Sequence, residues 1–260
     1  MELNFKFYQC LDKSNSLDSI LLLHGLFGSS KNWVSVSKHL SRYFNVYSLD
    51  LRNHGDSPHS NIHTIPEMAK DVEEFIQTHK LTNLHILGHS MGGLVAMYFD
   101  LHHQNLLKSL VIQDIAPRNY PFIYENEIAS MSFDLSLFRS RAEIDEKMKE
   151  YVPDSFIRQF LQMNLERTLD GKYVWKLNVN GIGKSDRVFL EQFENVSPSQ
   201  TKSLFLLGGS SEYITESDRK LIGNLFPNAR LETIPEGGHF IHFTHATNFL
   251  AHLDSFYNRL

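Results

Sequence analysis

The sequence has very little cysteine: Cys10 is the only one in 260 residues. A single thiol excludes an internal disulfide and a zinc site built from cysteines, and it fits a reducing compartment. The sequence also lacks an excess of one charge, because 25 lysines and arginines stand against 30 aspartates and glutamates, a net charge of −5. The acidic excess is spread along the chain, so we expect no nucleic-acid partner and no anionic-membrane partner.

Long hydrophobic segments are lacking as well. The longest apolar stretch, residues 94–99, is far shorter than the ~18 to 20 residues that a bilayer-spanning helix needs. The first ten residues, MELNFKFYQC, carry an acid at position 2 and no apolar central region, which argues against a signal peptide. We therefore expect a cytoplasmic protein without a membrane partner.

What the sequence does contain is a regular alternation of short aliphatic runs with longer amphipathic segments. The aliphatic runs read as buried strands at residues 20–23, 45–49, 84–87 and 109–112. Strand–helix–strand alternation predicts an α/β fold with a mostly parallel central sheet and helices on both faces. Helices on both faces also explain why the strands are unbroken aliphatic runs.

One predicted helix has a marked beginning. Thr64 and Glu67 are spaced as in a capping box, with Pro66 in the first turn. Apolar residues at helical spacing follow, so we expect this helix to start directly after Thr64.

The pattern changes after residue 117. Residues 118–200 are rich in aromatic side chains and favour helices at 136–151 and from 154 to about 165, then a hairpin at Asp170-Gly171 and a strand over 173–179. Strand and helix signals return at 203–207, 216–226 and 230–234, with a last helix near 248–259. We predict an α/β core formed by residues 1–117 and 201–260, with residues 118–200 inserted as a small, mainly helical cap.

The segment Gly88-His-Ser-Met-Gly92 matches G-x-S-x-G and lies between a predicted strand and a predicted helix. A sharp strand-to-helix turn exposes the serine, and the small glycines let neighbouring backbone approach. Ser90 then lies at a helix N-terminus, where free N–H groups favour developing negative charge. Ser90 is the candidate nucleophile; the structural alternative is a helix-capping serine in a glycine-rich loop.

Taken with four further segments, this motif makes the chain resemble the α/β-hydrolase fold family, specifically its small serine esterases with a short helical cap. The five segments begin at His24 (HGLFGS), Asp50 (DLRNHGDS), Gly88 (GHSMGG), Asp114 (DIAP) and Gly237 (GGH). The resemblance implies an eight-stranded, mostly parallel sheet. Because the N-terminal segment is short, one early strand of that pattern is expected to be missing here.

A serine nucleophile needs a general base. The sequence has 14 histidines, and His239 stands out because it follows the last predicted strand in a Gly-Gly-His loop. The resemblance places the base at this position. His24 and His89 flank tight turns beside the site, so we expect them to support the loops.

The acid that orients the base has two candidates. Most family members carry it after the seventh strand, and aligning on Gly208 puts that position at Ser211, which cannot act as the acid. Glu212 lies one residue further, and Asp114 lies after the sixth strand, where a subset of the family has its acid. Successive residues of an extended segment point in opposite directions, so we favour Asp114 and keep Glu212 as the alternative.

The oxyanion of a tetrahedral intermediate needs fixed donors. The backbone N–H of Met91 is one candidate. By position in the family the other is the N–H of Leu26, with Phe27 as the fallback. Six aromatic residues of the insertion are expected to form mostly a small core of their own, with a few facing Ser90: Phe122, Phe133, Phe138, Phe156, Phe160 and Trp175.

These residues predict a serine esterase that cleaves small carboxylic esters or thioesters through an acyl-serine intermediate, with no metal and no cofactor. A carbon–carbon bond hydrolase and a perhydrolase can use the same triad. A receptor that hydrolyses its ligand slowly and works by binding it is an alternative of a different class. The expected partner is a small acyl ester or thioester, and the expected state is a monomer or small homo-oligomer.

Overall fold

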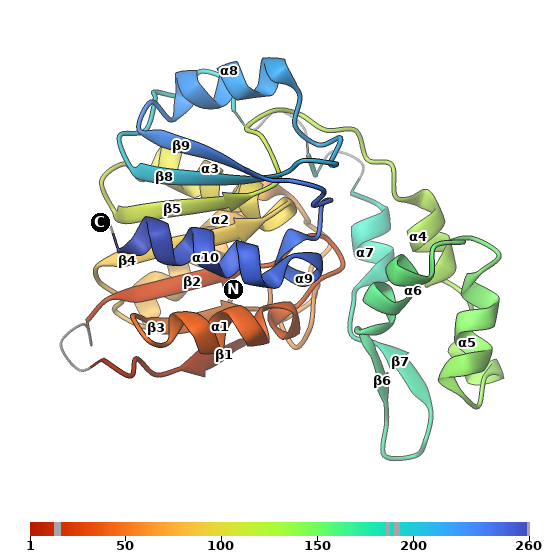
Figure 1. The fold of residues 1–260 in the computed structure, drawn as a ribbon. Helices are drawn as coiled ribbons and strands as arrows, with labels where there is room; N and C mark the ends of the chain where they lie inside the picture. The colour runs from red at the N-terminus through yellow and green to blue at the C-terminus, as the bar shows by residue number, and fades with distance from the viewer. Residues whose placement is uncertain (13–16, 186–187, 190–192, 259–260) are drawn as a thin grey trace.

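The computed structural model describes residues 1–12, 17–185, 188–189 and 193–258. Its main sheet is mostly parallel (Figure 1). The strands are β1 (Phe5–Tyr8), β2 (Ser19–Leu23), β3 (Asn45–Leu49), β4 (Leu84–His89), β5 (Leu107–Gln113), β8 (Lys202–Gly208) and β9 (Ala229–Ile234). They form a seven-stranded sheet in the order β1-β3-β2-β4-β5-β8-β9, in which only β1 pairs antiparallel. The predicted α/β fold is confirmed; within the described residues the sheet has one strand fewer than the eight of the family pattern.

Both faces of the sheet are covered by helices, as Figure 1 shows. Ile20 and Leu22 of β2 join one apolar core, and Leu21 and Leu23 of the same strand join another. The first core packs against α1 (Val34–Leu40), α9 (Ile241–Thr244) and α10 (Ala246–Tyr257). The second packs against α2 (Ile65–Thr78), α3 (Met91–His102) and α8 (Glu216–Leu225). Among the described residues, no helix is long and apolar enough to cross a membrane.

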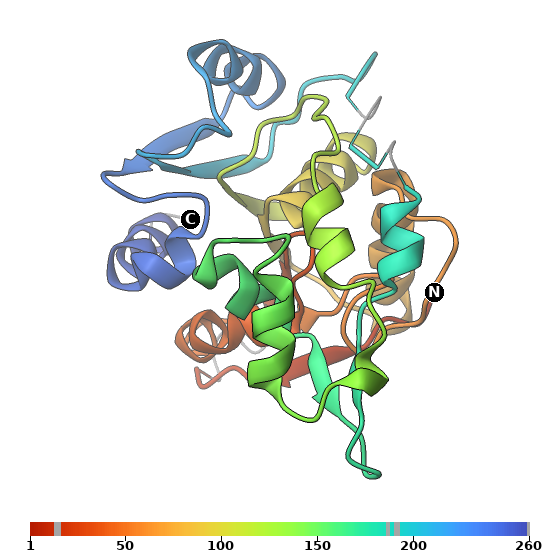
Figure 2. The ribbon, with the colours of Figure 1, turned by 90° about the vertical axis from the view of Figure 1, so that its right-hand side faces the viewer.

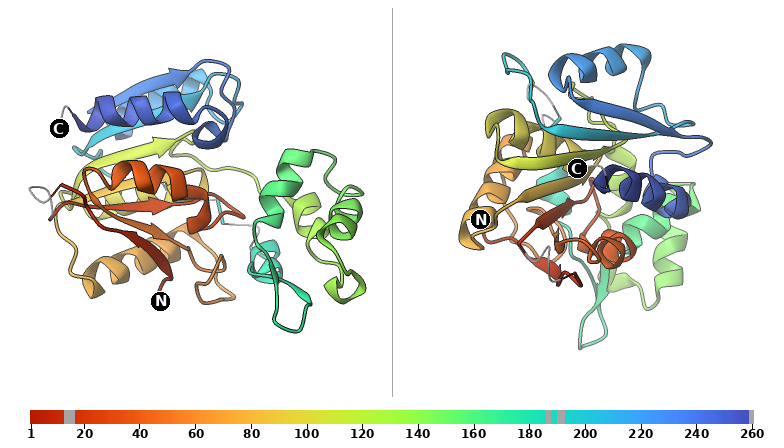
Figure 3. Two further views of the ribbon diagram at one scale, coloured as in Figure 1. Left: turned by 60° about the horizontal axis from the view of Figure 1, so that its bottom comes forward. Right: turned by 60° about the vertical axis from the view of Figure 1, so that its left-hand side comes forward.

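The chain between β5 and β8 forms a group of short elements beyond the ends of the strands, at the right of Figure 1 and facing the viewer in Figure 2. We call residues 118–200 the insertion segment. It contains α4 (Glu125–Ser130), the 3₁₀ helix η3 (Leu135–Leu137), α5 (Arg141–Met148), α6 (Ser155–Gln162), β6 (Leu165–Arg167), β7 (Tyr173–Trp175) and α7 (Val179–Gly183). The left view of Figure 3 also shows it beyond one end of the sheet.

Several local predictions were wrong in their boundaries. The helix expected over 136–151 covers only Arg141–Met148, because the side chain of Ser140 accepts a hydrogen bond from the N–H of Glu143 and starts the helix there. The strand expected over 173–179 ends at Trp175. Leu165, expected on a helix face, lies in β6. The last helix ends at Tyr257, and residue 259 is outside the described residues.

The capping box expected at the start of α2 does not form. Thr64 occupies the N-cap position with extended backbone, but its side chain makes no capping hydrogen bond. The carboxylate of Glu67 instead contacts the guanidinium of Arg52, which also forms a buried ion pair with Asp71. The charged guanidinium of Arg52 is a stronger partner for the Glu67 carboxylate than the backbone N–H of Thr64, with which the capping box would have paired it.

The glycines of the strand-to-helix turn are needed for close packing of the backbone. A Cβ on Gly92 would overlap the carbonyl oxygen of Leu23, whereas a Cβ on Gly223 in the exposed part of α8 would have no neighbour within 4 Å. We predict that Gly92→Ala lowers the free energy of unfolding by about 3 kcal/mol or more, since backbone must move. Gly223→Ala should raise it by about 0.5 to 1 kcal/mol. Urea unfolding of both variants tests this, and equal effects would contradict it.

Candidate active site

Ser90 lies at the turn between β4 and α3, with φ 51° and ψ −120°. This left-handed conformation is strained for a non-glycine residue. The backbone N–H of Ser90 donates to the carbonyl of Gln113 in the neighbouring strand β5 (3.2 Å), which holds the turn against the sheet. The side chain is largely buried, with 8% of its residue surface exposed, and it lines a cavity.

His239 is held by the buried carboxylate of Asp114. The Nδ1–H of His239 donates to Oδ2 of Asp114 over 2.8 Å. Asp114 has no exposed surface and follows β5 directly, with φ 52°. Its Oδ1 accepts the backbone N–H of Gly208 (2.8 Å), and its own N–H donates to the carbonyl of Leu206 (2.9 Å). These bonds fix the carboxylate from β5 and β8 before it meets the imidazole.

Ser211, at the position where most family members carry the acid, also contacts this carboxylate. Its hydroxyl donates to Oδ2 of Asp114. Sequence reasoning had excluded Ser211 as the acid without finding this role. Glu212, the alternative acid, is exposed, and among the described residues its carboxylate makes no hydrogen bond to His239. The structure therefore brings Asp114, and not Glu212, into contact with the histidine.

The loop that carries His239 is fixed by its backbone. Its carbonyl accepts hydrogen bonds from Nε2 of His89 (2.9 Å) and Nε2 of Gln113 (3.1 Å). The imidazole stacks on the ring of Tyr213, with ring centroids 3.8 Å apart. His239 and Ser90 line the same cavity. No hydrogen bond shorter than 3.5 Å joins their side chains in the described structure; catalytic hydrogen bonds of free enzymes are often long and shorten when substrate binds.

Four other histidines near the site are buried and neutral. Burial lowers the pKa of His24, His54 and His89, and it lowers that of His242 to about 3. Their hydrogen bonds agree with neutral rings: Nε2 of His54 accepts the N–H of Phe27, for example. A histidine kept neutral by burial is a poor proton acceptor, so these rings serve as supports, as expected for His24 and His89.

In the loop after β2, the N–H groups of Leu26 and Phe27 differ in whether they already have a hydrogen-bond partner. Phe27 has φ 60° and is held on both sides: its N–H donates to Nε2 of His54 (3.2 Å), and its carbonyl accepts Nδ2 of Asn164 (2.7 Å). The N–H groups of Leu26 and Met91 make no hydrogen bond within the described part of the chain. Leu26 and Met91 are therefore available as oxyanion donors, and the fallback, Phe27, is not. The contact from Asn164 in the insertion segment had no signal in the sequence.

The cavity at Ser90 has a volume of about 300 Å³. Its floor comes from the loop after β2, and its roof comes from the insertion segment. Of the six aromatic residues of the insertion segment, a few of which were expected to face Ser90, Phe160 alone lines the cavity; Phe133 and Phe138 pack on each other, with centroids 5.2 Å apart. The lining residues are Gly25, Leu26, Phe27, His89, Ser90, Ile123, Tyr124, Glu127, Ile157, Phe160, Leu161, Tyr213, His239 and Phe240.

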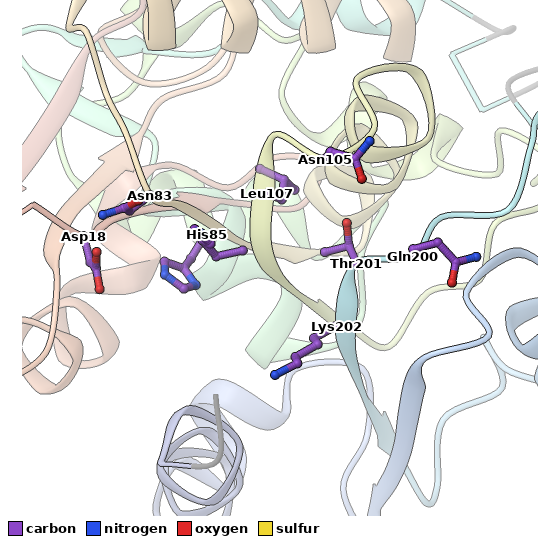
Figure 4. A pocket seen from close by; sticks show the side chains of 9 residues that line it. Asp18, Asn83, His85, Asn105, Leu107, Gln200, Thr201 and Lys202 are labelled. Carbon is purple, nitrogen blue, oxygen red and sulfur yellow. The ribbon is translucent and has the colours of Figure 1, made fainter.

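A second depression, of about 550 Å³, lies at the opposite ends of the strands (Figure 4). Its lining is polar and includes His85, whose Nδ1 lies 2.7 Å from the hydroxyl of Ser109. Ser109 has no exposed surface, so a substrate cannot reach this serine–histidine pair. No group of three or more metal-ligating side chains occurs among the described residues.

A serine at a strained strand-to-helix turn and a carboxylate-bound histidine on one cavity define the class of serine hydrolases. The chain belongs to the α/β-hydrolase fold family, whose model matches residues 18–246.

Lipases and esterases are among the proteins that this chain is similar to. The sn-1-specific diacylglycerol lipase ABHD11 of Mus musculus is 32% identical over 258 residues, which cover 96% of this chain and 84% of that protein. Esterase YbfF of Escherichia coli is 30% identical over 244 residues, 93% of each chain. A solved structure described as a marine microorganism esterase has a TM-score of 0.91 and 37% identity, covering 98% of this chain and 100% of that one. The expected family and the expected enzyme class, a carboxylic ester hydrolase, are confirmed by these findings.

Proposed function

We propose that this protein hydrolyses small carboxylic esters or thioesters through an acyl intermediate on Ser90. The observation that carries the proposal is the contact of His239 Nδ1 with Asp114 Oδ2 at 2.8 Å, beside a cavity that also holds Ser90. This contact leaves Nε2 of His239 as the proton acceptor. The reaction needs no metal and no cofactor.

In the first half of the reaction, Nε2 of His239 takes the proton of the Ser90 hydroxyl while Oγ attacks the ester carbonyl carbon. The carbonyl oxygen becomes an oxyanion, for which the N–H groups of Leu26 and Met91 are the proposed donors. The tetrahedral intermediate then collapses, and His239 gives its proton to the departing alcohol or thiol. The acyl group remains on Ser90.

In the second half, a water molecule takes the place of the alcohol. His239 accepts a proton from the water, whose oxygen attacks the acyl carbon, and then returns that proton to Ser90 Oγ as the carboxylic acid leaves. Asp114 stabilises the imidazolium in both halves and keeps the proton of the neutral ring on Nδ1. The hydrogen bonds from Gly208 and Ser211 keep the Asp114 carboxylate in this orientation.

The proposed substrates are small because the cavity is small. About 300 Å³ is at the lower end of the range for sites that bind small molecules. The mouse relative is named a diacylglycerol lipase and the bacterial relative simply an esterase. The cavity volume favours short acyl groups for this chain over two long lipid chains.

The proposed domain organisation follows from the same cavity. Residues 1–117 and 201–260 would be the catalytic core, and the insertion segment would be a cap, since Ile157, Phe160 and Leu161 of α6 line the cavity opposite Leu26. We propose a cytoplasmic location and no nucleic-acid partner, in keeping with the net charge of −5. A monomer or small homo-oligomer remains the expected state.

A panel of p-nitrophenyl esters and acyl thioesters, from acetyl to lauroyl, tests this function. We predict multiple turnovers with an optimum at acetyl or butyryl, because longer chains exceed the cavity. A burst of one equivalent of product without further turnover would instead support the alternative of a receptor that hydrolyses its ligand slowly and works by binding it. Cleavage of a carbon–carbon substrate, or peracid formation from hydrogen peroxide, at rates above ester hydrolysis would support the two other enzyme reactions.

A further inference from the structure

The cavity at Ser90 contains a charged side chain that ester hydrolysis does not use. Among the described residues that line it, Glu127 of α4 is the only acidic one, and none is a lysine or an arginine. Most of the other walls are aliphatic or aromatic. A carboxylate in such a place is costly unless it has a partner.

Within the described residues, the Glu127 carboxylate has no such partner: no other residue donates a hydrogen bond to it, and it belongs to no ion pair. Burial raises the pKa of Glu127. Its neighbour Glu125 is exposed to solvent and does not line the cavity. Glu127 is half-buried, so its carboxylate is left, in the described part of the chain, to water or to a molecule that enters the cavity.

The position of Glu127 relative to His239 shows which part of a substrate it would face. The hydroxyls of Tyr124 and Tyr213 lie 3.0 Å apart, and Tyr213 stacks on the His239 imidazole. Glu127 follows Tyr124, the N-cap residue of α4, by three positions, so the two side chains are on the same side of the helix, and both line the cavity with Tyr213. His239 protonates the leaving oxygen, so the alcohol portion of the ester lies on the His239–Tyr213 side.

We propose that Glu127 determines specificity for the alcohol portion of the substrate: it accepts a hydrogen bond from a hydroxyl there and repels a carboxylate. The inference rests on the proposed ester hydrolysis and adds to it a substrate class, esters of polyhydroxy alcohols that retain a free hydroxyl. A hydroxyl bound to Glu127 supplies a donor that none of the described residues provides to this carboxylate. An anionic alcohol portion would bring a second negative charge beside the half-buried Glu127, against mostly apolar walls that screen the repulsion less than bulk water does.

Three butyrate esters of similar size test the proposal: propyl, 2-hydroxyethyl and carboxymethyl butyrate. Their kcat/KM values are compared for wild type, Glu127→Gln and Glu125→Gln. The glutamine at 127 keeps the size of the side chain and removes the charge, and the change at 125 removes the same charge from the exposed side of α4. Thermal unfolding of each variant checks that the fold is intact.

We expect wild type to prefer the 2-hydroxyethyl ester over the propyl ester by about tenfold, the value of a hydrogen bond to a charged group. Glu127→Gln should reduce that preference severalfold and raise kcat/KM for the carboxymethyl ester about tenfold relative to the propyl ester, while Glu125→Gln changes neither ratio. Ratios that are equal in wild type and Glu127→Gln overturn the inference while leaving ester hydrolysis intact. If wild type cleaves none of the three esters faster than Ser90→Ala, the proposed function fails and the inference fails with it.

Discussion

Replacing Ser90 with alanine should lower kcat/KM for short-chain esters by about 10⁶-fold, to the level of weak background catalysis. The substitution removes only the hydroxyl group, whose oxygen Oγ would form the bond to the acyl carbon. The remaining site keeps its cavity and the Leu26 and Met91 donors, so substrate should still bind. Steady-state kinetics with p-nitrophenyl butyrate, together with the KM or a competitive-inhibition constant, measures both effects.

The same substitution should leave stability nearly unchanged. Although Ser90 is the N-cap residue of α3, its side chain makes no capping hydrogen bond. A change of less than about 1 kcal/mol in the free energy of unfolding is therefore expected. Retention of more than a tenth of wild-type activity by a folded Ser90→Ala protein would remove Ser90 from the reaction.

The second large effect is expected at Asp114. Asparagine at this position replaces one carboxylate oxygen with an amide that donates, so the imidazole of His239 is driven to the tautomer with its proton on Nε2. That tautomer cannot take the proton of Ser90. We predict a loss of about 10⁴-fold in kcat with a small change in KM.

Glu212→Gln is the matched control for Asp114→Asn, because it makes the same chemical change in the competing acid. Glu212 is exposed, so its substitution should change kcat by less than about twofold. With its amide NH2 toward His239, the Asp114→Asn variant also loses the acceptor for the Ser211 hydroxyl, so urea unfolding must accompany the kinetics. A large loss from Glu212→Gln and a small one from Asp114→Asn would transfer the role of the acid to Glu212.

The sequence was sufficient for features that depend on neighbouring residues. The aliphatic run of β2 indicated a strand buried on both faces, and its alternate residues do enter two separate cores. The strand-to-helix turn at Ser90 could be predicted, because the glycines, the strand and the helix that define it are neighbours in the sequence. The preference for Asp114 over Glu212 could be argued from the sequence, because successive residues of an extended segment point in opposite directions and Glu212 directly follows Ser211.

Features that depend on distant segments were not readable. The side chain of Asn164 reaches the carbonyl of Phe27 across 137 positions, and the Ser211 hydroxyl reaches Asp114 across 97. Glu127 had no sequence signal, because its place in the cavity depends on how the insertion segment folds beside Ser90. At α2 a local motif was overruled by the long side chain of Arg52.

The proposed reaction requires a covalent bond between Ser90 and the acyl group. Rapid-quench mass spectrometry detects that bond directly. Wild-type protein mixed with p-nitrophenyl butyrate and quenched in acid within milliseconds should carry one butyryl group, located by proteolysis on the peptide that contains Ser90. Ser90→Ala treated in the same way should carry none. A butyryl group on another residue, or turnover with no adduct even when Asp114→Asn slows deacylation, would contradict the account.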